Sequence, residues 1–231
     1  WFFVQTANIN PEARSAEFRD EIMGRLIRFV SAHEVGHTLG LPHNMGSSSA
    51  YPVDSLRSAH FTNRYGTAPS IMDYARFNYV AQPEDKGVSL MPNVGVYDKH
   101  SIKWGYRPIL EAKNAKEEKP ILDKWILDHE NDPMYRFGSQ QFGNPIDPSS
   151  QTEDLGDDAI KSSKYGIENL KKIAPKIKDW TDKEGEDFQD LRDLYQQIFN
   201  QFNRYMGHVI ANVGGIYENY KTTDQKGAVY S

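Results

Sequence analysis

Three histidines and a glutamate lie within eleven residues, in an order that suits a catalytic metal site. The stretch reads His33-Glu34-Val35-Gly36-His37-Thr38-Leu39-Gly40-Leu41-Pro42-His43. On an α-helix, which turns 100° per residue, the rings of His33 and His37 lie about 40° apart and one turn along, so both can reach one ion. Glu34 lies about 100° round the helix from His33, which places its carboxylate beside an open position of that ion.

A glycine and a third histidine complete the predicted site. Gly40 can adopt the positive φ that ends a helix and turns the chain back, so that His43 becomes a third ligand. Three neutral imidazoles leave a fourth tetrahedral position for water, which is the coordination of catalytic rather than structural zinc. We therefore expect His33, His37 and His43 to bind Zn²⁺, with Glu34 as the catalytic base. The plain alternative is a helix that carries three unrelated histidines.

The elements around this stretch follow from the spacing of apolar residues. Residues 18–39 repeat apolar side chains every three or four positions, which predicts one long helix closed by the glycine and proline just beyond it. The apolar run 1–5 predicts a strand that ends in a turn. Residues 44–70 are rich in Ser, Asn, Pro and Gly and predict a loop, whereas residues 97–106 predict a short helix.

The second half of the chain is also predicted to be helical. Five charged residues within 113–119 indicate a seam between two parts, and a long loop rich in Pro, Gly, Ser and Asp is predicted over 132–156. Apolar stripes in 157–178 and 188–213 predict two further helices. The loop between them is short enough for an antiparallel hairpin.

Composition narrows the classes of function. The 231 residues carry a net charge of -5, so a phosphate backbone has little to bind and no nucleic-acid partner is expected. No apolar run reaches the 18 residues of a membrane span. The absence of cysteine excludes thiolate ligands, Cys nucleophiles and disulfides. The chain opens on Trp1 without an initiator Met or a signal-peptide n-region, so we expect it to be a piece of a longer protein.

A second motif, Ser70-Ile71-Met72-Asp73-Tyr74, follows the histidines. Together the two motifs resemble the metzincin clan of zinc peptidases, in which a tight methionine turn lies under the metal site. The sequence is most similar to a bacterial Met-zincin family catalogued as a domain of unknown function. The similarity covers most of the chain and rests on the stretches 33–44, 48–55, 70–79, 97–106, 154–158 and 205–215.

The resemblance implies a fold and roles for two further residues. The implied fold is mainly α, with little strand. Residues 1–112 would form a truncated zincin-like (α+β) catalytic region whose upstream sheet is missing, and residues 113–231 a helical C-terminal region. Met72 would form the floor under the histidines. Tyr74 would turn its phenol onto the zinc or the developing oxyanion, as a second catalytic residue.

The resemblance also implies an activity. It is that of a zinc metalloendopeptidase, in which Glu34 assists the attack of zinc-bound water on a peptide carbonyl of a protein or peptide substrate. A secreted, periplasmic or outer-surface location is implied as well. The oligomeric state and the cleavage-site preference do not follow from the sequence.

Two other functions stay open. The chain could bind zinc and yet act as a non-catalytic helical module with a structural or partner-binding role, because the sheet edge that pairs with extended substrate would lie upstream. Alternatively, the same zinc chemistry could act on an amide in a cell-wall polymer.

Two further sites are weaker candidates. The acidic loop from Asp147 to Asp158 could hold calcium, although it lacks the residue order of an EF-hand loop, and its last two aspartates suit the start of the next helix. Among the remaining histidines, His60 could line the cleft, although a surface position is the plainer expectation. His100, His129 and His208 have no partners at ligand spacing.

Overall fold

Helices joined by long loops make up the structure, a computed structural model that describes residues 1–15, 18–143, 145–185 and 187–227. No strand is assigned within these ranges, so the expected mainly α architecture is confirmed. The elements in chain order are α1 (Phe2–Thr6), η1 (Pro11–Arg14), α2 (Asp20–Thr38), η2 (Ser48–Ala50), η3 (Ser55–Arg57), α3 (Ala59–Tyr65), α4 (Val96–Tyr106), α5 (Ala115–Leu127), η4 (Pro133–Tyr135), α6 (Ala159–Ile173), η5 (Ala174–Lys176), α7 (Ile177–Thr181) and α8 (Gln189–Ile210).

The long helix α2 carries the first two histidines and confirms the helix predicted over 18–39. Asp20 and Glu21 occupy its first turn, where negative charge interacts favourably with the helix dipole. Gly40, with φ of 83°, follows the end of the helix and reverses the chain. One face of α2 is buried and includes Ile22, Phe29, His33 and Gly36.

A second face of α2, about 120° round the helix from the buried one, is apolar and exposed. Met23, Ile27 and Val30 are 42%, 58% and 50% exposed, respectively. These residues follow one another at helical spacing, and Glu34 continues the same stripe. The apolar periodicity therefore predicted the helix correctly but overstated how much of it is covered in this structure.

The prediction of a strand over residues 1–5 was wrong. Phe2–Thr6 forms the short helix α1, in which the Thr6 hydroxyl donates to the Phe2 carbonyl and the Ala7 amide donates to the Phe3 carbonyl. Every residue of α1 is buried, with Phe2 against Phe77 and Phe3 against Trp180. Because a short apolar run buried on all sides has no periodicity, it fits a helix as well as a strand.

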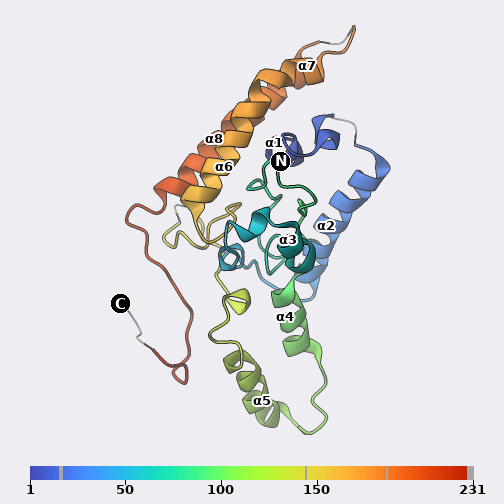
Figure 1. The fold of residues 1–231 in the computed structure, drawn as a ribbon. Helices are drawn as coiled ribbons and strands as arrows, with labels where there is room; N and C mark the ends of the chain where they lie inside the picture. The colour runs from blue at the N-terminus through green and yellow to red at the C-terminus, as the bar shows by residue number, and fades with distance from the viewer. Residues whose placement is uncertain (16–17, 144, 186, 228–231) are drawn as a thin grey trace.

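The helical hairpin near the C-terminus has the predicted form. α6 and α8 run side by side, with α7 at the far end of the pair (Figure 1). The Asp158 carboxylate caps α6 by accepting from the Lys161 amide. Leu170, Ile173 and Ile198 are buried between the helices and the rest of the protein.

Two segments are more helical than their composition indicates. Within the expected loop 44–70, Ser58 caps the helix α3 by accepting from the Phe61 amide. The charged stretch 113–119 includes the first turns of α5, whose N-cap Asn114 accepts from the amides of Lys116 and Glu117. In both places one capping side chain, rather than apolar periodicity, starts the helix.

One cluster of buried residues joins the two halves of the chain. It connects α1, the loops between 51 and 91, and the hairpin helices α6 and α8. The rings of Tyr79 and Tyr205, both fully buried, lie 4.7 Å apart at its centre. This shared packing fixes the loops around the histidines against the C-terminal helices, and the division at residue 112 stays a prediction.

The segment after α8 returns along the loop that precedes α6 (Figure 1). The Ile216 amide donates to the Ile146 carbonyl, and the Glu218 amide donates to the Asp147 carboxylate. Among the described residues, no helix combines the length and apolar character that crossing a membrane requires.

Candidate metal centre

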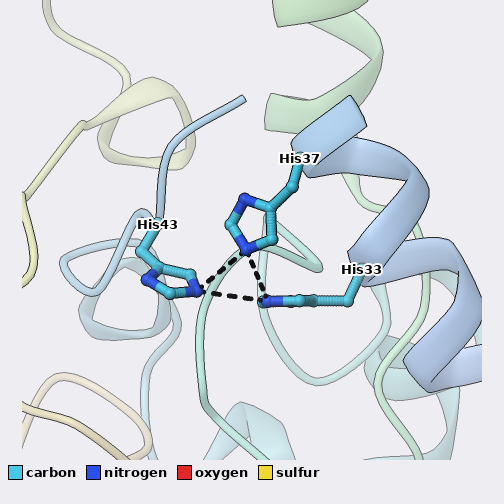
Figure 2. Close-up of side chains that lie close together, drawn as sticks. All are labelled: His33, His37 and His43. Carbon is cyan, nitrogen blue, oxygen red and sulfur yellow. Dashed lines mark hydrogen bonds between the residues drawn. The ribbon is translucent and has the colours of Figure 1, made fainter. Parts of the chain in front are cut away.

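The three motif histidines converge on one point. Figure 2 shows His33 and His37 reaching out from successive turns of α2 and His43 facing them from the loop beyond. Their Nε2 atoms lie 3.1 Å apart for His33 and His37, 3.2 Å for His33 and His43, and 3.0 Å for His37 and His43. In the described part of the chain, no other three His, Cys, Asp or Glu side chains come close enough to share an ion.

Hydrogen bonds on the far side of each ring decide which nitrogen faces the centre. His33 Nδ1 donates to the Ile71 carbonyl at 2.8 Å, and His37 Nδ1 donates to the Leu41 carbonyl at 2.9 Å. His43 Nδ1 donates to the Gln140 side-chain oxygen at 2.7 Å. Because these oxygens can only accept, each neutral ring carries its proton on Nδ1 and presents a bare lone pair at Nε2.

This arrangement fits a zinc ion. With every ring proton on Nδ1, none of the three Nε2 atoms can donate a hydrogen bond across the contacts drawn in Figure 2. Three lone pairs that face one another at 3.0–3.2 Å repel unless they share a cation. Tetrahedral zinc with Zn–N distances of 2.0–2.1 Å keeps its nitrogens about 3.3–3.4 Å apart, within a few tenths of an ångström of the observed triangle. The donor set and its spacing therefore suit zinc.

The electrostatics of His33 also suit metal binding. His33 is 5% exposed, and its pKa is lowered mainly by this burial, with smaller contributions from the neighbouring rings of His37 and His43. A lowered pKa keeps the imidazole neutral, which is the form that binds metal.

A turn centred on Met72 packs against the helix that carries His33 and His37. The Met72 amide donates to the Ser70 hydroxyl, and the Met72 carbonyl accepts from the Asn44 amide at 3.1 Å. Met72 is 1% exposed and packs with Phe29 and Ile71. A Cβ added at Gly36 would overlap Met72 Sδ, so the helix and the methionine are in direct contact at a position between His33 and His37.

Two buried carboxylates hold the turn at Met72 against the neighbouring loops. Asp98, from α4, accepts from the Ser70 hydroxyl and from the amides of Ile71 and Gly95 at 2.6–2.8 Å. Asp73 accepts from the Ser48 amide at 2.6 Å. Burial raises the pKa of both groups above the ordinary value for an aspartic acid. These contacts connect the methionine turn to the loop that follows the third histidine.

The two predicted catalytic side chains lie beside the cluster in different settings. Glu34 is exposed, and within the described residues its carboxylate makes no hydrogen bond or ion pair, although its charge interacts with His33. The half-buried Tyr74 ring stacks on His33 with centroids 5.2 Å apart and lies 4.5 Å from the ring of His43. Arg76 contacts the same tyrosine ring at 4.7 Å.

The other candidate residues lie elsewhere. His60 is exposed on α3. His100 and His129 contact each other, with centroids 5.1 Å apart, and border a groove of about 850 Å³ between α5 and the C-terminal segment. None of the three motif histidines lines that groove, or the smaller cavity of about 370 Å³ between residues 39–42 and α4. His208 is buried in α8 and donates to the Thr152 carbonyl.

Three aspartates of the acidic loop make protein contacts, whereas Oδ1 of the buried Asp154 has no hydrogen-bond partner among the described residues. Asp147 pairs with Arg136 at 2.9 Å and accepts from the Ser149 amide. Asp157 accepts from the Val53 amide, and Asp158 caps α6 as the sequence indicated. These aspartates therefore hold the loop against its neighbours.

Sequence reasoning missed Gln140. It lies 97 residues beyond His43 in a long loop without periodicity, and nothing in its neighbourhood marks it as part of a metal site. Only the fold brings its side chain to the third histidine.

Comparison with known proteins agrees with the geometry. A family model described as Met-zincin matches residues 15–231. No curated protein and no solved structure matches the chain. Because the match extends over nearly the whole sequence and the histidine cluster suits a metzincin-like zinc site, the chain belongs to the Met-zincin family.

Proposed function

We propose that this protein is a zinc-dependent metalloendopeptidase. The observation that carries the proposal is the triangle of three unprotonated Nε2 atoms, 3.0–3.2 Å apart, next to a free carboxylate on the adjoining residue of the same helix. His33, His37 and His43 would hold the ion. When bound, zinc lowers the pKa of a water molecule and polarises the substrate carbonyl.

The side chains around the ion would have separate roles in catalysis. Glu34 would accept a proton from the attacking water and then deliver it to the amine that leaves when the peptide bond breaks. Tyr74 would donate a hydrogen bond from its phenol to the carbonyl oxygen as negative charge develops there. The turn at Met72 would support His33 and His37 without competing for the metal, as the methionine turn of the clan does.

The test is hydrolysis of a quenched fluorescent peptide library by zinc-loaded protein. The wild type should cleave peptides, and Glu34→Gln should cleave none while it keeps one zinc per chain, because glutamine cannot accept the proton. Glu21→Gln is a matched control, since Glu21 is an exposed acid on the same helix, and it should leave the rate unchanged. Cleavage by Glu34→Gln at the wild-type rate would contradict the assignment.

A second function has one observation in its favour. The exposed apolar stripe of Met23, Ile27 and Val30 on α2 suits a helix that packs against another surface. A module that binds zinc and a partner, without catalysis, would use this face. The same library separates the two functions, because such a module would hold one zinc per chain and cleave no peptide.

A further inference from the structure

The third histidine is oriented differently from the other two. Backbone carbonyls, those of Ile71 and Leu41, accept from the Nδ1 atoms of His33 and His37. His43 instead depends on a side chain, the amide of Gln140, at 2.7 Å. A substitution can therefore remove the acceptor for His43, whereas the acceptors for the other two ligands belong to the main chain.

The segment that carries Gln140 is docked closely against the ligand loop. The Gly138 amide donates to the Asn44 side-chain oxygen at 2.9 Å, and the Asn44 side-chain nitrogen donates to the Arg136 carbonyl at 2.9 Å. The Gly46 amide donates to the Gly138 carbonyl at 3.2 Å. Asn44, which directly follows His43, is fully buried, so these bonds fix the segment where Gln140 must lie.

The two glycines explain how the segments come so close. A Cβ at Gly138 would lie 2.8 Å from the Gly46 Cα, and a Cβ at Gly46 would lie 2.9 Å from the Gly138 Cα. Neither position has room for a side chain without a shift of backbone. Beyond Gln140, the neighbouring Gln141 bonds the main chain of Ile146, Asp147 and Ser150. Gln140 is thus held from both sides.

We propose that Gln140 is a positioning residue of the metal centre. Its side-chain oxygen holds the proton of His43 on Nδ1, which leaves Nε2 free as a ligand and fixes the orientation of the ring. The loop over 136–141 is thereby part of the metal centre. This inference rests on the zinc site of the proposed function and not on peptide hydrolysis.

The first readout is the tautomer of His43 in zinc-free protein, measured from the ¹⁵N shifts of its ring nitrogens by NMR. In the wild type the proton should lie on Nδ1. In Gln140→Leu a substantial fraction should move to Nε2, and Gln140→Glu, which keeps an accepting oxygen, should restore the wild-type pattern. An unchanged tautomer in the leucine variant would overturn the proposal, whether or not the protein proves to be a peptidase.

The second readout is the Kd for zinc, measured by competition with a chelating dye. Gln140→Leu should raise the Kd by about 10- to 100-fold, the usual effect of losing such a partner of a ligand histidine. Gln140→Glu should bind at least as tightly as the wild type. Ser139→Ala, which removes only the contact with Tyr220, is the neighbouring control and should leave the Kd unchanged.

These measurements distinguish a role of Gln140 in orienting the His43 ring from a role in holding the loop over 136–141 in place. If the glutamate variant bound zinc as weakly as the leucine variant, the accepting oxygen would have no role and the proposal would fail. Should Gln140→Leu unfold, Gln140→Ala gives the same two readouts with less apolar bulk. If the wild type bound no zinc, both the proposed function and the role of Gln140 in a metal centre would fail, whereas zinc binding without peptide cleavage would overturn the proposed function alone.

Discussion

Substitution of Gly36 by alanine tests the packing of helix α2 on Met72. The new Cβ would overlap Met72 Sδ and lie 3.3 Å from its terminal methyl. Met72 is 1% exposed and packs with Phe29 and Ile71, so it has little space into which to move. Overpacking a buried contact of this kind costs about 1–3 kcal/mol.

Alanine also has an intrinsic advantage over glycine in a helix, which must be subtracted. That advantage is about 1 kcal/mol. Gly24 lies in the same helix, and a Cβ there would meet nothing within 4 Å, so Gly24→Ala should show the advantage alone. The free energy of unfolding of Gly36→Ala should therefore lie about 1–3 kcal/mol below that of Gly24→Ala.

The assay is thermal unfolding of both variants in chelator, followed by circular dichroism, so that metal does not contribute. For a chain of this size, 1 kcal/mol corresponds to about 2–4 °C in Tm, so the two variants should differ by about 2–12 °C. Equal midpoints, both above the wild type, would show that Met72 does not pack under the ligands and would refute the reasoning.

Three further outcomes are expected. Tyr74→Phe should keep one zinc per chain and lower kcat by about 10²–10³-fold, which is the usual effect of losing one donor to a developing oxyanion. If the variant turned over peptide at the wild-type rate, Tyr74 would have no part in the mechanism. Zinc at about 1,000 times its Kd should add about 4 kcal/mol to the free energy of unfolding. His43→Ala should abolish this gain, which is measured by comparing thermal melts of the protein with zinc and with chelator. Burial lowers the pKa of His208 to about 4. Between about pH 6.5 and 4 the unfolded state therefore binds more protons at this residue than the folded state does. The free energy of unfolding should fall by up to about 3 kcal/mol as the pH falls through this range. Measured against wild type by denaturant titration, His208→Gln should lack this loss.

Much of the helical framework could be predicted from the sequence because periodicity records which face a helix buries. The bounds of α2, α4 and the α6–α8 hairpin follow from it to within a few residues. The helix α1 could not be distinguished from a strand, since all of its residues are buried. The helices α3 and α5 begin at the capping residues Ser58 and Asn114 rather than at an apolar stripe.

The candidate metal site, too, could be predicted from the sequence only in part. His33, His37 and His43 could be found because a helix and one turn place them at fixed spacings in the chain. Gln140 could not, because its contact with His43 depends on a loop 97 residues away that docks through backbone bonds and two glycines. Local spacing therefore reveals the ligands but not the residues that orient them.

X-ray absorption at the zinc edge of the loaded protein tests the central claim most directly. It reports the number and kind of atoms around the ion and their distances. Three imidazole nitrogens at about 2.0–2.1 Å together with one oxygen from water would match the three histidines and an open fourth position. A shell with fewer than three imidazoles, or one closed by a fourth protein ligand, would contradict the account.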